Sequence, residues 1–501
     1  MKAAHSDRQP EPVKLPRSAA VPLGSSRRFA LDSAAGLLTP AERAGRGKAA
    51  RSAVPRDSHA AYDPPTDRPD PVGLLERQAA TRLPDLVPVR YSRMLASPFS
   101  YFRGAALSMA ADLAATPVSG LAVQACGDAH LSNFGVYASP ERALVFDLND
   151  FDETLPGPWE WDVKRLAASL EVAGRGNGYR PGARRKVVTA TVSRYREAMR
   201  VFAGQDNLAV WYARAETGTL REQFGSQLAA REQRQADRAV AKARTRDSLQ
   251  AFAQLTQQVD GRPRIMADPP LVVPLSDLVA DSTDQSKLET ELRRLIGSYQ
   301  RTLETDRRYL LEQFEFADMA RKVVGVGSVG TRCWIVLMLG RNASDPLFLQ
   351  VKEAERSVLE DFAGASRYAN HGHRVVAGQR LMQAASDIFL GWQRNQVDPD
   401  GRPHDFYIRQ LRDEKFSADI EAMTAAGMRA YGELCGWTLA RAHARSGDRI
   451  AIAAYLGQSA AFDQAIAEFA AAYADQNERD YRALTAAVAS GRVTASTEGS
   501  A

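Results

Sequence analysis

The sequence has few cysteines and no long apolar run. Only three of its 501 residues are cysteine, Cys126, Cys333 and Cys435, and they lie far apart with no CxxC pair. This pattern indicates neither a disulfide framework nor a zinc site, and it favours a reducing, cytoplasmic location. No apolar stretch approaches the roughly 20 residues of a membrane span, and no apolar segment with a cleavage site follows the N-terminus. We therefore expect neither membrane insertion nor export.

The chain also lacks a strong charge of one sign. It has 65 Lys plus Arg against 60 Asp plus Glu, a net charge of +5. This excess is too small to predict a nucleic-acid partner. Because 45% of the residues are hydrophobic, the chain can bury one large or two medium cores.

Local patterns divide the chain into five parts. Residues 1–70 mix Pro, Arg, Ser and Ala without periodicity and predict a disordered basic tail, and residues 491–501 predict a second one. Residues 71–315 have mainly helical patterns, with an exposed charged helix or helix pair beginning at "TLREQFGSQ". Residues 316–418 are the most β-rich segment, and residues 419–490 are helical again. We expect a mainly helical body interrupted by a compact β-rich unit.

Three glycines, Gly325, Gly327 and Gly330, form the motif "GVGSVG". In a dinucleotide-binding fold a helix would follow, but here the strand-like "TRCWIVLML" follows. The glycines therefore predict the tip of a β-hairpin, which is either a purely structural turn or one whose N–H groups approach phosphate oxygens.

Lys352 follows in the apolar stretch "LFLQVKEA". A lysine buried in a strand needs an anion, whereas one on the exposed side of an edge strand does not. Together with the glycine turn, Lys352 matches the strand lysine that binds nucleotide phosphates in kinases.

Polar residues cluster in "CGDAHLSNFG" and at the end of the hairpin predicted after it. Asp128 and Asn133 share the first loop, and Asp147, Asp150 and Asp152 follow. Phosphoryl transfer needs a carboxylate base, an amide oxygen for one Mg²⁺ and a second carboxylate for the metal ions. We expect Asp128 to be the base and Asn133 and Asp150 to be metal ligands, with Asp147 as the alternative to Asp150.

The stretches "GDAHLSNFG", "VFDLNDFDE" and "WEWDVKRLA" resemble the catalytic and metal-binding loops of aminoglycoside phosphotransferases and choline-kinase-like enzymes. From about residue 60 to 490, including "SPFSYFRG" and "FYIRQLRD", the chain also resembles the bacterial domain-of-unknown-function family 2252. The first resemblance implies an α+β, protein-kinase-like fold with a mainly helical large lobe and a small β-rich lobe. It also implies ATP and Mg²⁺ as cofactors, and a hydroxyl acceptor on a small molecule or a protein.

The order of the motifs differs from that of kinases, in which the glycine loop and the strand lysine precede the catalytic loop. A circular permutation reconciles the two orders, because "YGELCGWTLARAHARSGD", which contains His443, resembles the helix that leads into the catalytic loop. The permuted order predicts Lys352 across a cleft from Asp150 or Asp147, with roughly 4 to 10 Å between charged groups. It also predicts that the 431–445 helix ends near "LAVQA".

Other residues have weaker predicted roles. Glu360, with Glu355, is the candidate partner of Lys352, although surface pairing is the simpler interpretation of both. Gln379 and Arg380 are alternative partners of Lys352, and His130 and His443 are expected to be structural. Cys126 stands before "GD", where the phosphotransferases usually have a His. Arg409, Arg412 and Lys415 are candidate substrate contacts.

The leading hypothesis is an ATP- and Mg²⁺-dependent phosphotransferase. Nucleotidyl (AMP) transfer on the same fold and a catalytically silent nucleotide-binding or scaffold module are the alternatives. A nucleic-acid-binding protein is a third, which depends only on the basic tail. The acceptor does not follow from the sequence, because the helices that would form its site have a generic composition.

Overall fold

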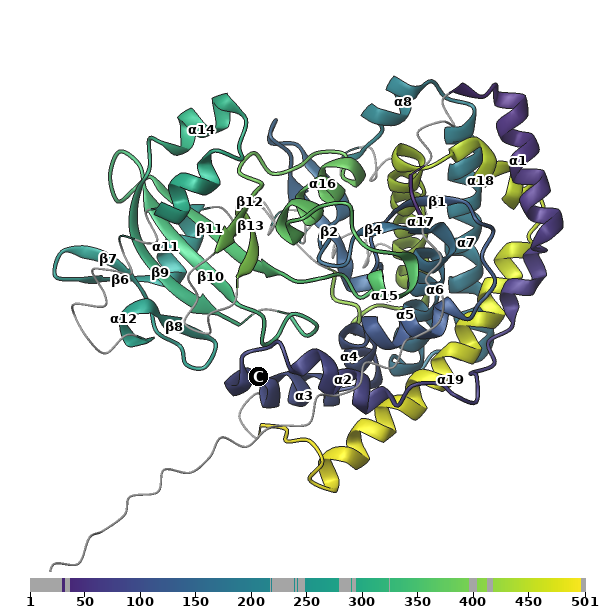
Figure 1. The fold of residues 1–501 in the computed structure, drawn as a ribbon, viewed down its shortest axis with the longest axis horizontal. Coiled ribbons are helices and arrows are strands. Elements are labelled where there is room, and N and C mark those ends of the chain that lie inside the picture. The colour runs from purple at the N-terminus through teal and green to yellow at the C-terminus, as the bar shows by residue number, and fades with distance from the viewer. Residues whose placement is uncertain are drawn as a thin grey trace, which may run out of the picture.

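A helical half and a β-rich half lie side by side in the described chain (Figure 1). The structure is a computed structural model, and it describes residues 29–31, 37–216, 248–278, 294–323, 325–395, 403–411 and 418–496, with the single residues 218, 238, 241 and 290. The mixture of helices and strands confirms the predicted α+β class. The charged helix predicted from residue 219 onward lies mostly outside the described residues.

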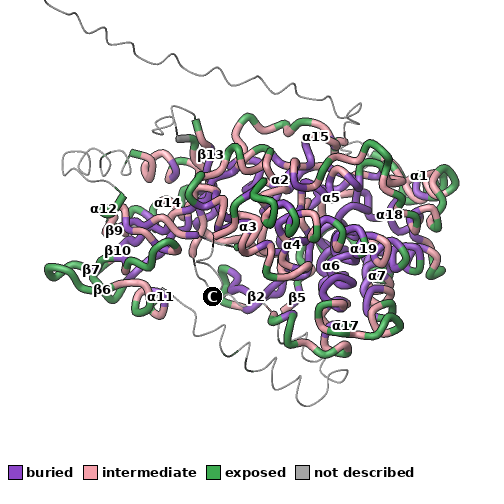
Figure 2. Tube along the Cα trace, turned by 90° about the horizontal axis from the view of Figure 1, so that it is seen from below, coloured by how far each residue is buried: buried purple, intermediate pink, exposed green. Residues whose placement is uncertain are grey.

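Helices from distant parts of the chain build the helical half. Its longest members are α6 (Trp159–Gly176), α7 (Pro181–Ala203), α17 (Ala425–Ser446) and α19 (Ala461–Ala489). Helices α7 and α17 pack along each other, and a Cβ on Gly436 would collide with the Thr191 carbonyl, so glycine permits this approach. Nearly every residue of α6 is buried (Figure 2). No described helix has both the length and the apolar character that a membrane crossing needs.

Shorter helices surround these four. They are α1 (Pro40–Ala53), α2 (Pro71–Ala79), α3 (Val87–Leu95), α4 (Pro98–Gly104), α5 (Ala106–Ala114), α8 (Asn207–Tyr212) and α18 (Arg449–Leu456), with the 3₁₀ turns η2 (Arg56–Ala60), η3 (Pro84–Leu86) and η4 (Leu131–Asn133).

An antiparallel sheet of six strands, in the order β12-β13-β11-β10-β9-β8, forms the β-rich half. Lys352 lies on an inner strand, opposite Cys333 of β10 and Tyr407 of β13, and it is 2% exposed. The buried-strand interpretation of Lys352 is therefore confirmed. The strands are β8 (Val272–Pro274), β9 (Glu315–Lys322), β10 (Cys333–Leu339), β11 (Pro346–Ala354), β12 (Gly391–Asn395) and β13 (His404–Gln410). The helices of this part of the chain are α11 (Ser248–Leu255), α12 (Leu275–Leu278), α14 (Thr305–Leu311), α15 (Glu360–Ala363) and α16 (His371–Met382).

The β-rich half begins earlier in the chain than the predicted boundary at residue 316. Strand β8 pairs with β9, so residues 272–274 belong to the sheet. Ahead of it, β6 (Thr256–Val259) and β7 (Arg262–Ile265) form a largely exposed hairpin (Figure 2). Strands of three or four residues are too short for a periodic pattern to show in the sequence.

Two small sheets bring the predicted catalytic segments together. Strand β1 (Ala122–Ala125) pairs with β4 (Leu155–Pro158). The predicted hairpin is present as β2 (Phe134–Ala138) and β3 (Leu144–Leu148), with β5 (Ala215–Glu216) along β3. The loop before β2 and the loop after β3 meet, since the Asn149 N–H donates to the Asn133 carbonyl oxygen at 3.0 Å.

Part of each predicted tail is ordered. Helix α1 begins with a capping box of Thr39 and Glu42, and Arg43 on it forms a 2.8 Å ion pair with Asp448, contacts that the composition of the segment does not reveal. At the other end, the Ser496 N–H donates to the Pro88 carbonyl oxygen at 3.1 Å. Residues 1–28 and 497–501 lie outside the described residues.

Candidate active site

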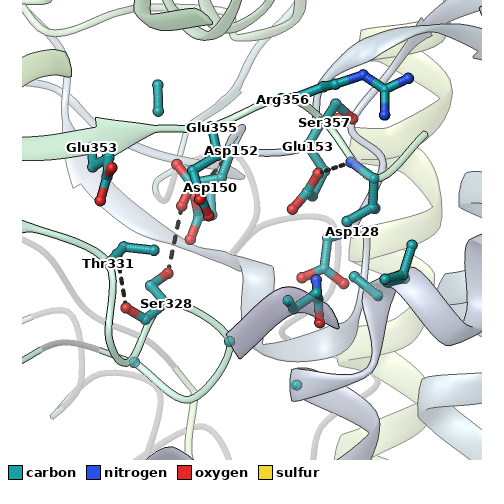
Figure 3. Close-up of a pocket in the computed structure, with 18 of the residues that line it drawn as sticks. Asp128, Asp150, Asp152, Glu153, Ser328, Thr331, Glu353, Glu355, Arg356 and Ser357 are labelled. Atoms are coloured by element: carbon teal, nitrogen blue, oxygen red, sulfur yellow. Dashed lines mark hydrogen bonds between the residues drawn. The ribbon is translucent and has the colours of Figure 1, made fainter. Parts of the chain in front are cut away.

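A cavity of about 760 Å³ lies between the two halves. Its lining comes from the loops around Asp128 and Asp150, from the turn between β9 and β10, and from the end of β11. Figure 3 shows Asp150 and Asp152 close together, with Ser328 of the turn on one side and Asp128 further along the cavity. Residues that are far apart in the sequence therefore face one space.

Lys352 contacts two of the predicted loop carboxylates. Its Nζ lies 2.8 Å from Asp152 Oδ2 and 3.5 Å from Asp150 Oδ1. The Tyr407 hydroxyl donates to Asp152 Oδ1 at 2.6 Å. The distance to Asp150 is slightly shorter than the predicted range, and Asp152, which had no assigned role, is the principal partner of Lys352.

The three charged groups shift one another's pKa values. Burial and the charge of Asp152 raise the pKa of Asp150, although Lys352 acts in the opposite direction. Burial also acts to raise the pKa of Asp152, but the charge and hydrogen bond of Lys352 outweigh it and the pKa is lowered. Despite burial, the two carboxylates hold the pKa of Lys352 well above its ordinary value. Two carboxylates thus share one ammonium group, and an additional cation would be favourable beside Asp150.

The loop of residues 126–133 brings Asp128 and Asn133 to the same cavity. Asp128 Oδ1 accepts from Arg165 Nε at 2.8 Å. Asn133 Nδ2 donates to the carbonyl oxygens of Asp128 (2.9 Å) and Asp150 (3.1 Å), and so connects the two loops. Burial raises the pKa of Asp128, and the charges of Arg165 and Arg103 oppose the rise.

Residues beneath this loop hold its backbone. The Asp162 carboxylate accepts from the N–H groups of Cys126 (2.6 Å) and Gly127 (2.9 Å), and His443 contacts the same carboxylate. Next to them, the Gln124 N–H donates to Ser446 Oγ at 3.2 Å. The C-terminal end of α17 thus lies against β1, which confirms the predicted contact and the structural role of His443.

Asp147 has a different role from the predicted one. It is 1% exposed, its Oδ2 accepts from the Ala384 N–H at 2.8 Å, its Oδ1 accepts from the Leu148 N–H at 2.9 Å, and Arg441 pairs with it. These contacts satisfy the carboxylate away from the cavity lining, so the prediction of Asp147 as a metal ligand is wrong. The strand alternation of β3 turns this side chain away from the loop.

Glu360 is also not the partner of Lys352. Its oxygens accept from the N–H groups of Ser357 (3.2 Å) and Ser366 (3.1 Å), and it does not belong to the cavity lining. Glu360 therefore stabilises the segment after β11.

The remaining candidate side chains fall into three groups. Gln379 donates to Gln383 and Arg380 donates to the Leu390 carbonyl, so neither pairs with Lys352. Glu355 and Arg409 line the cavity, where Arg409 Nη1 donates to the Asn149 carbonyl at 2.9 Å. Arg412 and Lys415 lie outside the described residues.

The glycine motif is the turn between β9 and β10, as predicted. Gly325 and Gly330 have φ angles of 65° and 91°, which favour glycine. Residues of the helical half hold the turn by its carbonyl oxygens. Arg93 Nη1 donates to the Gly325 carbonyl (2.6 Å), and the Leu83 N–H donates to the Gly330 carbonyl (2.8 Å). Gly325 and Gly327 line the cavity, whereas Gly330 does not. Among the described residues, no backbone oxygen accepts from the Gly327 N–H.

The carboxylate and amide side chains fit a Mg²⁺ site completed by a substrate. Among the described residues, no three His, Cys, Asp or Glu side chains converge to hold a metal by themselves. However, Asn149 lines the cavity, and its Oδ1 is buried without a hydrogen-bond partner. Mg²⁺ commonly takes only one or two protein carboxylates and binds phosphate oxygens and water besides. Asp150 with the amide oxygens of Asn133 and Asn149 can supply that protein share.

The family model described as "Uncharacterized protein conserved in bacteria (DUF2252)" matches residues 82–487. The chain belongs to this family. The matched range of this DUF2252 protein includes Asp128, Asp150 and Lys352, whereas α1 and α2 precede it. No curated protein and no solved structure matched the chain.

Proposed function

We propose that this DUF2252 protein is an ATP- and Mg²⁺-dependent phosphotransferase with a circularly permuted, protein-kinase-like fold that acts on a hydroxyl acceptor. The observation that carries the proposal is the contact of Lys352 with Asp150 and Asp152. These residues come from different halves of the molecule, and Lys352 and Asp152 are 200 positions apart in the sequence. The contact lies beside a glycine turn and the Asp128 loop, which is the combination that phosphoryl transfer requires.

Each element of the site has a part in the proposed reaction. Lys352 and the N–H groups of the glycine turn bind nucleotide phosphates and orient the γ-phosphoryl group. Mg²⁺, held by Asp150 with Asn133 and Asn149, would neutralise charge on these phosphates. Lys352 is 2% exposed and lies behind Asp150 and Asp152, which line the cavity while it does not, so a phosphate would have to displace part of this pairing to reach Nζ.

Asp128 is the proposed base. Arg165 fixes Oδ1, and Oδ2 can accept the proton of the acceptor hydroxyl. The acceptor oxygen then forms a bond to the γ-phosphorus, the bond between this phosphorus and its bridging oxygen breaks, and ADP leaves with the electron pair.

The test uses purified full-length protein, a pool of metabolites and ATP labelled at the γ- or the α-phosphate. We expect Mg²⁺-dependent transfer of γ-label to an acceptor by the wild type and none by Asp128→Asn. Transfer of α-label would establish nucleotidyl transfer instead. Mg²⁺-dependent ATP binding without label on any product would favour the silent nucleotide-binding module, and absence of ATP binding would refute all three.

A further inference from the structure

Three arginines, Arg82, Arg90 and Arg103, line one wall of the cavity and are called the arginine wall below. Arg82 precedes α3, Arg90 is on α3 and Arg103 is on α4. Each of them has a buried nitrogen without a hydrogen-bond partner, and none forms an ion pair within the described part of the chain. None of them is used by the proposed transfer of the phosphoryl group.

Arg90 is 0% exposed. Its Nη2 donates to Gln78 Oε1 (2.9 Å) and to the Gly104 carbonyl (3.1 Å), while Nε and Nη1 have no partner. Burial and the neighbouring charge of Arg82 lower the pKa of Arg90 well below its ordinary value. A buried guanidinium without an anion is unfavourable, so these contacts leave Arg90 one oxyanion short of a satisfied site.

The arginine wall extends from the proposed base to the glycine turn. At one end is Arg103. Burial lowers the pKa of Arg103, and the negative charges of Asp128 and Glu421 oppose this effect. At the other end, Arg82 donates to the Val329 carbonyl of the turn. The turn also approaches the backbone of Arg103, because a Cβ on Gly327 would lie 3.2 Å from the Arg103 carbonyl oxygen.

We infer that the arginine wall binds an oxyanion group of the acceptor, so that the molecule whose hydroxyl reaches Asp128 also carries a phosphate or a carboxylate. The inference rests on the proposed function and names its class of substrate. Lys352 on β11 is the proposed cation for the nucleotide phosphates, whereas the charge of Arg103 acts on Asp128, the proposed base that the acceptor must reach. Arginine forks match phosphate and carboxylate oxygens in geometry and charge.

Inorganic phosphate is the probe, and its binding is measured by calorimetry with and without saturating Mg²⁺ and a non-hydrolysable ATP analogue. We expect the wild type to bind phosphate in both conditions. Arg103→Gln should weaken phosphate binding at least tenfold and leave affinity for the analogue within about threefold. Arg77→Gln is the matched control, because Arg77 lines the same cavity but is already paired with Asp361, and it should change neither affinity. Lys352→Met should weaken only the analogue.

Competition with bound phosphate shows whether the arginine wall prefers a phosphate or a carboxylate group. Glycerol 3-phosphate or glycerate should displace the bound phosphate, depending on whether the site takes a phosphate or a carboxylate, and glycerol should not. Displacement of phosphate by the ATP analogue, an equal loss of both affinities in Arg103→Gln, or no phosphate binding at millimolar concentration would overturn the inference. Arg103→Lys, which retains the charge, should bind phosphate with intermediate affinity, and the retained affinity of Arg103→Gln for the ATP analogue shows that this variant has not simply misfolded. Nucleotide binding and phosphate binding are measured separately. A wild type that binds phosphate but not the ATP analogue would therefore refute the proposed function and leave only an oxyanion site at the arginine wall.

Discussion

The His443 Nε2 of α17 lies 3.1 Å from the Asp162 Oδ2 of α6, and both side chains are buried. The other ring nitrogen of His443 contacts the Tyr195 hydroxyl at 2.8 Å. Because Asp162 also accepts from the N–H groups of Cys126 and Gly127, one carboxylate joins a helix near the C-terminus to the loop that carries Asp128.

Removing this carboxylate should destabilise the protein. Asp162→Ala leaves the N–H groups of Cys126 and Gly127 and the His443 imidazole without their acceptor, and we expect a loss of about 3 kcal/mol in the free energy of unfolding by urea. His443→Gln should cost about 1 to 2 kcal/mol, and the double variant should cost less than the sum. Asp475→Ala is the control, because this aspartate is 59% exposed in its ion pair with Arg175 and should cost at most about 0.5 kcal/mol. Additive losses would contradict the coupling.

Asp128→Asn should abolish phosphoryl transfer and leave ATP affinity within about threefold. A base acts in the transition state and not in ground-state nucleotide binding, and asparagine retains an oxygen for Arg165. The measurements are steady-state turnover and calorimetric titration with ATP. Turnover within tenfold of the wild type would show that Asp128 is not the base.

Lys352→Met should weaken ATP binding and turnover together, each by at least about tenfold. Methionine fills the buried space on β11 but supplies no cation for the phosphates. Lys186→Met on α7 is the matched control, since Lys186 is exposed and does not belong to the cavity lining. Unchanged affinity and turnover in Lys352→Met would remove this lysine from the site.

Asp150 and Asp147 should differ in their effect on the Mg²⁺ dependence of ATP binding. Asp150→Asn should raise the Mg²⁺ concentration needed for half-maximal binding at least about tenfold, because it removes the proposed carboxylate ligand. Asp147→Asn should leave that concentration unchanged but lower stability by about 3 kcal/mol, because Arg441 loses its buried partner. The opposite pattern would restore the sequence-based assignment of Asp147.

Glu153 should make stability depend on pH. Burial raises the pKa of its carboxyl from 4.5 to about 7, against the Val358 N–H and Arg374. The folded protein therefore retains this proton between pH 4.5 and 7 while the unfolded chain releases it, so the contribution of Glu153 to stability falls as the pH rises through that window. Glu153→Gln should thus gain roughly 2 to 3 kcal/mol on the wild type between pH 4.5 and 8 in Mg²⁺-free urea titrations. Glu468→Gln, at a residue 54% exposed, should show no such trend, and a constant offset in Glu153→Gln would contradict the assignment.

The sequence predicted best the contacts that neighbouring residues determine. Asp128 and Asn133 share one loop, and the apolar neighbours of Lys352 indicate a buried strand. The partner of Lys352 could not be predicted, because the choice between Asp152 and Glu360 depends on how the two halves meet. Asp147 was misassigned because its side chain follows the alternation of β3, whereas Asp150 lies in the loop beyond.

Helix α1 and the arginine wall were both missed, but only the helix had a recognisable pattern in the sequence. Helix α1 was missed because the composition of residues 1–70 favours disorder, although Thr39 and Glu42 have the spacing of a capping box. The arginine wall had no comparable signal. Arginine is usually exposed, and nothing in the spacing of Arg82, Arg90 and Arg103 shows that the fold places them along one cavity.

The contact between Asp162 and His443 also affects the time at which the site can form in a growing chain. The two residues are 281 positions apart, and ribosomes add about 5 to 20 residues per second, so Asp162 waits roughly 15 to 60 s for its partner. During this interval the loop with Asp128 exists as a peptide but lacks the helix that supports it, and Lys352 is made only in the later part of the interval. A nascent or truncated chain that ends before α17 therefore contains Asp128, Asp150 and Lys352 without a complete site, and the proposed activity would be acquired only among the last events of its synthesis.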